Sequence, residues 1–255
     1  MKLRVLGCSG GIGGRHLRTT SFLVDHDILI DAGTGVAELS LAELAAIDHV
    51  FLTHAHLDHM LALPLLIDAV AARRERPLLV YALAEVIEVL QQHIFNWAIW
   101  PDFTCLPNAE QPFVRFVPIE VGSTICLGDR KVAALPVNHT VSAVGYHLDS
   151  GKGSLVFSGD MGPSEAFWQV VTDISNLRYL LVECAFSNQE CGLAKLSKHM
   201  CPRFLAEELR RLDRPCDLFI THLKPGDIER TMLEIKNSLV DFSPEMLQNN
   251  QVFEF

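Results

Sequence analysis

Short apolar runs alternate with longer amphipathic stretches along this chain, and glycines or polar turns separate them. A short apolar run between turns is typical of a buried strand, whereas apolar positions repeating every three or four residues indicate a helix. The pattern predicts strands at Leu3–Leu6, Thr20–Val24, Ile28–Asp31, Asp48–Thr53, Leu78–Tyr81, Tyr179–Glu183 and Asp217–Ile220, and a β-rich region from Phe113 to Phe157. It predicts helices that end near Ala45, Ala72, Phe95, Thr172, Leu212 and Leu239. Strands and helices mixed in this order indicate an α/β fold.

The composition is that of a globular protein with a large core. The chain has 255 residues, of which 49% are hydrophobic, and its mean hydropathy is +0.22. Because α/β folds of this length form single domains, we expect one domain over residues 1–255. The apolar run before Gly7 is too short for a signal peptide or a membrane span, which predicts a cytoplasmic protein without a membrane partner.

Charge and cysteine content argue against two classes of protein. The formal net charge is −10 and the pI is about 5.5, so the surface should repel long nucleic acids. The 7 cysteines form no CxxC pair, which argues against a cysteine zinc ribbon or a disulfide framework. We expect reduced core thiols at Cys8, Cys105, Cys126, Cys184, Cys191, Cys201 and Cys216.

The glycine-rich segment Gly7–Gly14 superficially resembles a dinucleotide-binding loop. Such a loop needs a helix directly after it, whereas this segment is followed by two predicted strands. We therefore expect a loop beside the active site. Asp31, at the end of the second of these strands, is expected to accept a hydrogen bond from a metal-binding histidine.

The segment His54-Ala-His-Leu-Asp-His59 places four metal-capable side chains between a predicted strand and a predicted helix. Imidazole and carboxylate ligands suit zinc, manganese or iron, and a catalytic ion keeps one coordination position for water. His54 and His56 fit one ion, while Asp58 and His59 are displaced enough to serve a second. The spacing therefore predicts a metal site with two ions.

Three further candidates each follow an apolar strand: His139, Asp160 and His222. Strand ends converge on one rim of an α/β sandwich, so these side chains should meet the first group. We expect His54, His56 and His139 at one ion, Asp58, His59 and His222 at the other, and Asp160 between them. Two divalent ions, most simply zinc, would lower the pKa of a shared water and favour hydrolysis of an anionic ester.

These residues resemble the ligand series of the metallo-β-lactamase superfamily, and the resemblance spans nearly the whole chain. It implies a four-layer αββα metallo-β-lactamase-like sandwich. The nearer likeness is to class II cyclic-nucleotide phosphodiesterases, whose signature begins His-x-His-Leu-Asp-His, as at His54–His59, and whose cap contains a passage similar to Ile94–Phe103. The likeness implies cleavage of cyclic AMP or cyclic GMP to the 5′-nucleotide, with an aromatic cap around residues 93–112. This chain departs from the family signature, which continues with a Gly or Ser and later a Ser, where this chain has Ala62 and Asp68.

Other segments are similar to the tRNase Z branch of that superfamily: Val137–Thr140, Gly145–Tyr146, Glu183–Phe186 and Lys198–His199. This likeness implies that Glu183 orients His199 and that His199 protonates the departing 3′ oxygen. We therefore expect Asp58, Glu183 and His199 to be catalytic residues.

Several alternatives remain open at the level of sequence. A tRNase Z-like enzyme would need a basic docking surface, and the net charge of −10 disfavours one. Further alternative hypotheses are an iron-dependent redox protein of the same fold, a lactonase or lactamase, and a binding module without metals. The expected substrate is a small anionic phosphodiester. The aromatic residues Trp97, Trp100 and Phe103 could stack on its base. A homodimer is a possible assembly.

Overall fold

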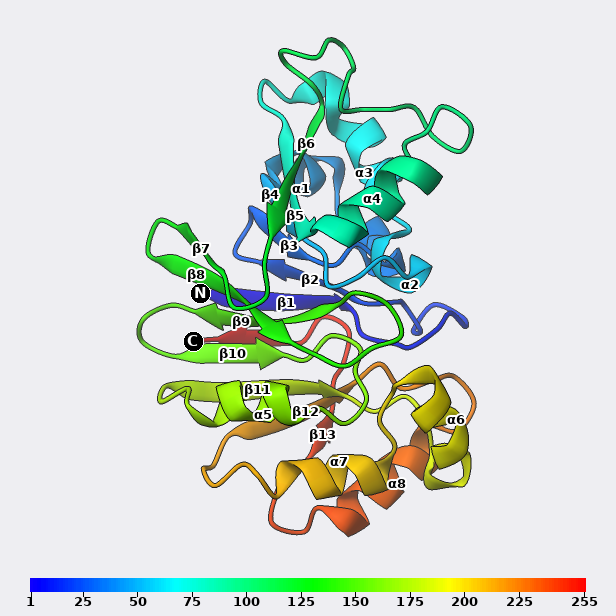
Figure 1. The fold of residues 1–255 in the computed structure, drawn as a ribbon, viewed down its shortest axis with the longest axis vertical. Coiled ribbons are helices and arrows are strands. Elements are labelled where there is room, and N and C mark those ends of the chain that lie inside the picture. Colours follow the sequence, from blue (N-terminus) through cyan, green and yellow to red (C-terminus); the bar gives the residue numbers. More distant parts are fainter.

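The computed structural model describes residues 1–255 as two seven-stranded sheets packed face to face between two groups of helices (Figure 1). The strand order of the first sheet is β14-β1-β2-β3-β4-β5-β6, and that of the second is β13-β12-β11-β10-β9-β8-β7. The first sheet comprises β1 (Lys2–Gly7), β2 (Ser21–Val24), β3 (Ile28–Ile30), β4 (His49–Phe51), β5 (Leu78–Leu83), β6 (Val114–Ile119) and β14 (Val252–Glu254). The second comprises β7 (Thr124–Leu127), β8 (Arg130–Pro136), β9 (Val144–Asp149), β10 (Ser154–Phe157), β11 (Leu177–Glu183), β12 (Asp217–Thr221) and β13 (Glu245–Met246).

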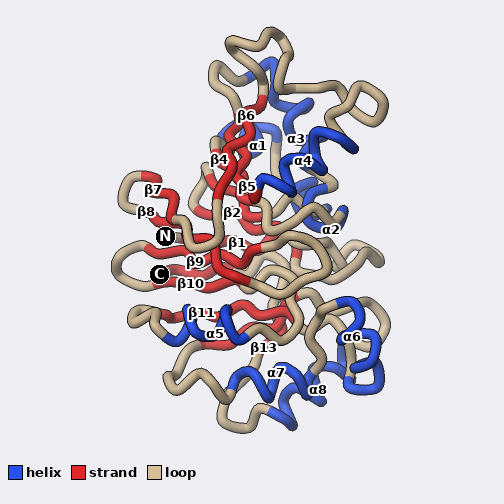
Figure 2. Tube along the Cα trace, viewed as in Figure 1, coloured by secondary structure: helices blue, strands red, loops and turns tan.

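Helices cover the outer face of each sheet (Figure 2). The first sheet carries α1 (Leu41–Ala46), α3 (Leu63–Val70) and α4 (Ala84–His93), and the second carries α5 (Glu165–Thr172), α7 (Pro202–Leu209) and α8 (Ile228–Ser238). Two shorter helices, α2 (Leu57–Met60) and α6 (Cys191–Ser197), lie at one end of the sandwich, and 3₁₀ turns occupy Thr34–Glu38, Ala71–Arg73 and Asn188–Glu190. The predicted αββα sandwich is confirmed.

Strand direction determines where the loops of the second sheet meet. β10, β11 and β12 are parallel, and β8 has the same direction because β8 and β10 are both antiparallel to β9. The carboxyl ends of these four strands therefore lie at one edge of the sheet. In the first sheet, β3, β4 and β5 are likewise parallel.

The apolar core has two parts that correspond to the layers. A cluster of 45 buried residues fills the space between the sheets and beneath α3 and α4. The ring of Phe22 meets that of Phe157 edge to face, with centroids 4.8 Å apart, and so joins the two sheets at their centre. A second cluster of 21 buried residues packs β10–β12 against α5, α7 and α8. Burial on this scale is the main stabilising contribution to such a sandwich.

An ion pair also connects the two sheets. The guanidinium of Arg130, on β8, donates to both carboxylate oxygens of Asp27 at 2.6 and 2.7 Å and to Asp25 at 3.0 Å. Both aspartates lie in the β2–β3 turn. Hydrogen bonding to Arg130 lowers the pKa of the Asp27 carboxyl.

Several elements differ from the sequence prediction. The helix predicted to end near Ala72 is divided into two, α2 and α3, of which α2 begins at Leu57. The helix α6 and the short strands β13 and β14 were not expected. β14 pairs with the amino-terminal strand β1 and so brings the two ends of the chain together. None of the helices has the length and apolar character that crossing a membrane would require.

The expectation of reduced core cysteines is wrong for much of the set. Cys191 and Cys201 form a disulfide with their Cα atoms 5.7 Å apart. They lie at the start of α6 and beyond its end, and the turn after that helix brings them within bridging distance. Cys105 and Cys126 are exposed, and Cys184 is the free cysteine that is buried.

Candidate metal centre

The loop after β4 delivers the first group of candidate ligands. His54 follows the strand, His56 precedes the first residue of α2, and Asp58 and His59 lie within that helix. The helical turn at this point replaces the alternation of a strand, so successive side chains no longer point to opposite faces. His54 and His59 are fully buried, whereas the side chain of Asp58 is 27% exposed.

The second sheet delivers the other candidates from its shared edge. His139 follows β8, Asp160 follows β10, Glu183 ends β11 and His222 follows β12. All four are buried. The structure therefore brings every sequence-predicted site residue into one cluster.

The candidate ligand atoms form two groups that share one aspartate. His54, His56, His139 and Asp160 have ligand atoms within 4.8 Å of one another, and the same holds for Asp58, His59, Asp160 and His222. Asp160 Oδ1 lies 3.2 Å from His59 Nε2 and 3.2 Å from His222 Nδ1, while Oδ2 lies 3.6 Å from His54 Nε2. One carboxylate thus faces both groups.

Several nitrogen and oxygen atoms of the candidate ligands are buried and unpaired. His54 Nε2, His59 Nε2, both ring nitrogens of His222 and Asp160 Oδ1 are buried without a hydrogen-bond partner. Buried polar atoms are nearly always paired, so a concentration of unpaired nitrogen and oxygen atoms at one point needs a ligand. Imidazole and carboxylate donors are those that zinc and other first-row divalent ions prefer. The residues fit such ions.

The protonation of most of these histidines also suits a metal. Burial lowers the pKa of His139 to about 4 and that of His222 to about 3, and it lowers the pKa of His54 and His56. A neutral imidazole offers the lone pair that coordination requires. His59 differs: burial opposes its protonation, but the carboxylates of Asp160 and Asp31 outweigh burial and raise its pKa.

Hydrogen bonds behind the cluster set which ring nitrogen faces it. Asp31 accepts from His59 Nδ1 at 2.7 Å and from the Thr53 hydroxyl at 2.8 Å. Because that hydroxyl donates to Asp31, its oxygen is left to accept from His54 Nδ1 at 2.9 Å. Asp31 therefore directs Nε2 of both histidines toward the cluster, which extends the role predicted for it.

Lys198 fixes His139 in a comparable way, and the sequence analysis assigned it no such role. Its carbonyl accepts from His139 Nδ1 at 3.0 Å, and its ammonium donates to the His139 carbonyl at 2.7 Å. His139 Nε2 is thereby aimed into the cluster, 3.2 Å from His56 Nδ1. The acceptor of the His139 Nδ1 bond is a backbone carbonyl, which every residue type has, so the amino-acid sequence does not indicate this contact. The contribution of Thr53 is similar, although its place between Phe51 and His54 could have suggested it.

Glu183 and His199 form a buried pair at the edge of the cluster. His199 Nδ1 donates to Glu183 Oε1 at 2.6 Å. The backbone N–H groups of Met161, Ala185 and Met200 also donate to this carboxylate, at 2.9, 3.0 and 3.2 Å. Both oxygens are occupied as acceptors, so the shared proton belongs to His199. Burial would lower the pKa of His199, but Glu183 outweighs it and raises that pKa.

The backbone is constrained around the cluster. Asp31 and His222 have φ values of 55° and 60°, a left-handed conformation that costs free energy for non-glycine residues and concentrates at functional sites. Gly10 packs against His222, and a Cβ atom at Gly10 would clash with the His222 carbonyl oxygen. The glycine-rich loop therefore lies against the candidate centre, and Gly10 permits the close approach.

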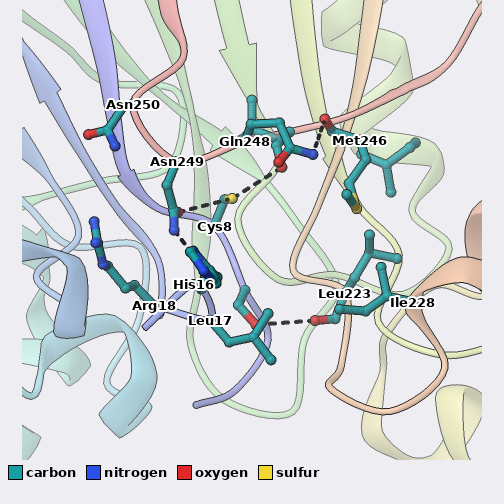
Figure 3. A pocket seen from close by; sticks show the side chains of 13 residues that line it. Cys8, His16, Leu17, Arg18, Leu223, Ile228, Met246, Gln248, Asn249 and Asn250 are labelled. Carbon is teal, nitrogen blue, oxygen red and sulfur yellow. Dashed lines mark hydrogen bonds between the residues drawn. The ribbon is translucent and has the colours of Figure 1, made fainter. Parts of the chain in front are cut away.

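A hollow of about 310 Å³ behind this loop shows how the loop is anchored (Figure 3). The thiol of Cys8 donates to the Leu247 carbonyl, and the Asn249 amide donates to the His16 carbonyl at 2.8 Å. The Ser9 hydroxyl donates to the Leu223 carbonyl. None of the candidate ligands lines this hollow, so it is separate from the metal-binding groups.

Comparison with known proteins places this geometry in a family. A family model described as "Beta-lactamase superfamily domain" matches residues 26–223, which include every candidate ligand. The chain belongs to the β-lactamase superfamily. The matched region includes both the His54–His59 loop after β4 and the ends of strands β8, β10, β11 and β12, and the predicted superfamily resemblance is confirmed.

The individual relatives have low sequence identity to this chain, but each match covers more than half of it. A probable 3′,5′-cyclic-nucleotide phosphodiesterase of Yersinia pestis is 25% identical over 273 residues, covering 87% of this chain and 77% of the relative. A ribonuclease Z of Haloarcula marismortui is 28% identical over 156 residues, covering 58% of this chain and 47% of its own length. The structure of unliganded yeast PDE1 superposes with a TM-score of 0.81 at 18% identity, covering 100% of this chain and 99% of that one, and shows the shared fold. The prediction of a hydrolytic enzyme of this superfamily is confirmed.

Proposed function

We propose that this enzyme uses two divalent metal ions to hydrolyse a 3′,5′-cyclic nucleotide, cyclic AMP or cyclic GMP, to the 5′-nucleotide. The observation that carries the proposal is the pair of ligand groups joined by Asp160, with the Glu183–His199 pair beside them. The relative named as a cyclic-nucleotide phosphodiesterase supports this choice of substrate.

The donor sets assign each residue a role toward the ions. His54, His56 and His139 would hold one ion, Asp58, His59 and His222 the other, and Asp160 both. Zinc is the first choice for this set of imidazoles and carboxylates, with manganese and iron as alternatives. Bound as a pair, such ions would lower the pKa of a water and offset the negative charge that develops on the phosphoryl group.

The residues of the chain supply proton transfer and orientation. With Nδ1 bonded to Glu183, His199 carries its second proton on Nε2, from which it would pass to the departing 3′ oxygen. Glu183 holds the ring in this orientation and is itself fixed by three backbone N–H groups. Asp58, the partly exposed carboxylate of the cluster, would be reached first by entering substrate and by water.

Processing of precursor tRNA is the second candidate, because a relative named ribonuclease Z matches 58% of this chain. The net charge of −10 gives no general attraction for a polyanion. A small cyclic diester avoids this repulsion, since it brings a single phosphate to the site.

The experiment is a substrate panel with defined metals. The purified enzyme is stripped with a chelator, reloaded with zinc, manganese or iron, and assayed with cyclic AMP, cyclic GMP and a precursor tRNA. We expect two ions per chain by elemental analysis and release of the 5′-nucleotide.

Two variants make the result specific to the cluster. His139→Ala should lower both the metal content and the rate, whereas His93→Ala, at the end of α4 and outside the cluster, should change neither. Cleavage of precursor tRNA with no 5′-nucleotide formed would overturn the cyclic-nucleotide assignment. One bound ion in the fully active enzyme would overturn the two-metal assignment.

A further inference from the structure

An apolar groove begins directly beside the ligand loop. It has a volume of about 220 Å³ and is lined by Leu57, Met60, Leu61, Pro64, Leu65, Ile94, Ile99 and Trp100. Leu57 stands between His56 and Asp58 in the sequence, so its Cα atom lies about 3.8 Å from those of two candidate ligands. One wall of the groove is therefore continuous in backbone with the His54–His59 loop.

The walls of the groove expose apolar side chains that a folded enzyme would normally cover. Leu57, Leu61 and Ile99 are 58%, 47% and 65% exposed. Leu57 begins α2 and Leu61 caps its carboxyl end in helical conformation, so the two residues, four apart, lie on the same face of this helix. Contiguous exposed apolar side chains of this kind are a common feature of ligand-binding grooves.

The opposite wall is held in one conformation by local hydrogen bonds. The side chain of Asn96 accepts from the N–H groups of Ala98 and Ile99 at 3.0 and 2.9 Å. The Trp100 N–H donates to the Ile94 carbonyl at 3.0 Å. A wall fixed before binding loses little conformational entropy when a ligand enters, which favours recognition.

The chemistry of the groove selects the part of a nucleotide that fits it. No charged side chain lines it, so it cannot neutralise a phosphate. Its volume of about 220 Å³ is below the roughly 300 Å³ at which pockets for whole ligands begin, so it suits a fragment of a ligand. A nucleobase is planar and largely apolar on its faces, and stacking on aromatic or apolar side chains is its usual mode of binding.

We propose that this groove is the base-binding subsite of the enzyme, with Leu61, Ile99 and Trp100 as its specificity-determining residues. The inference rests on the proposed cyclic-nucleotide function and adds the residues that recognise the nucleoside. It also revises the sequence expectation for the aromatic segment. Phe103 is buried in the core and Trp97 does not line the groove, so Trp100 is the aromatic residue of that segment in position to stack.

The test compares cyclic AMP with its abasic analogue, ribose 3′,5′-cyclic phosphate, in the metal-loaded enzyme. The variants are Leu61→Asp, Ile99→Asp and Trp100→Leu, and the first two alter exposed side chains that the fold does not require. Each should raise KM for cyclic AMP about tenfold or more, the range expected for a lost stacking contact, and leave kcat/KM for the abasic analogue unchanged. Leu233→Asp on α8, which is 60% exposed and far from the groove in sequence, is the matched control and should alter neither substrate.

The outcomes separate this inference from the function on which it rests. If the unaltered enzyme cleaves neither cyclic compound, the proposed function itself fails. If it cleaves both and the groove variants affect both equally or not at all, the phosphodiesterase stands and the base subsite is overturned. A shift from dimer to monomer in the variants with an unchanged ratio of the two substrates would instead identify the groove as an interface between copies of the chain.

Discussion

Nδ1 of His199 lies 2.6 Å from Oε1 of Glu183, in a pair whose carboxylate also accepts three backbone N–H groups. The proton on the far side of the imidazole is thus available to a leaving group. We expect His199→Ala to lower kcat about 10²–10⁴-fold for a cyclic nucleotide, the usual contribution of a general acid. Steady-state kinetics on the metal-loaded enzyme measures this.

The leaving group provides the control for that prediction. The leaving group of a p-nitrophenyl phosphodiester is the stable p-nitrophenolate ion, which needs no proton. The same variant should therefore lose far less activity toward this substrate. Equal losses on both substrates would show that His199 acts by holding the structure. Glu183→Gln, which changes a positioning residue, should reproduce the pattern in weaker form.

Asp31→Asn should weaken metal binding although Asp31 is not among the candidate ligands. Its carboxylate directs Nε2 of both His54 and His59 toward the cluster, through Thr53 in the first case. Loss of such a supporting contact typically costs 10–100-fold in metal affinity, which competition with a chromophoric chelator can measure. Asp68→Asn, an exposed acid on α3, serves as the control, and an unchanged affinity in Asp31→Asn would remove this role.

The double substitution Cys191→Ser with Cys201→Ala should reduce both stability and turnover. The bridge closes a segment with a sequence separation of 10, for which loop-closure entropy gives a stabilisation of about 2–3 kcal/mol. Lys198 and His199 lie inside the closed segment, so its loosening should also misplace both residues. Urea denaturation and kcat are the measurements, and Cys105→Ser, which removes an exposed free thiol, should change neither. A lower stability with unchanged kcat would show that the bridge does not position Lys198 and His199.

Arg130→Ala should destabilise the fold at neutral pH by about 1.5–3 kcal/mol, the range for hydrogen bonds to charged groups. Hydrogen bonding to Arg130 lowers the folded-state pKa of Asp27 below its unfolded value of about 3.9. The contribution of Asp27 is therefore present above that unfolded pKa and is lost as the pH falls through the folded value. The difference in free energy of unfolding between Arg130→Ala and the unaltered protein, measured by urea denaturation, should have its full value at pH 7 and decrease below about pH 4. A difference independent of pH would assign the loss to packing of the Arg130 stem.

The sequence was most informative where ligand type and strand context coincide. His54, His139, Asp160 and His222 each follow an apolar strand, and parallel strands bring such positions to one edge of a sheet. The arrangement of the site therefore follows from local pattern combined with a general rule of sheet geometry. The pairing of Glu183 with His199 came from family resemblance, because nothing in their separation along the chain predicts a contact.

Other features depend on tertiary contacts and leave little local signal. The helix α6 exposes Leu193 and Leu196, so it lacks the buried apolar stripe by which a helix is recognised in sequence. The bridge between Cys191 and Cys201 depends on the turn after that helix. The sequence could not show which aromatic residues of the segment Ile94–Phe103 are buried and which are exposed. The burial of Phe103 and the exposure of Trp97 depend on what packs against them.

The candidate ligands come from both sheets: the His54–His59 loop extends from the first, while His139, Asp160 and His222 extend from the second. Ions bound there would act as cross-links between the two halves of the sandwich. At a free metal concentration about 1,000 times its Kd, each ion would add about 4 kcal/mol to the free energy of unfolding. Chelation should therefore lower the melting temperature as well as the activity, and the lifetime of the protein in a cell would follow the supply of metal.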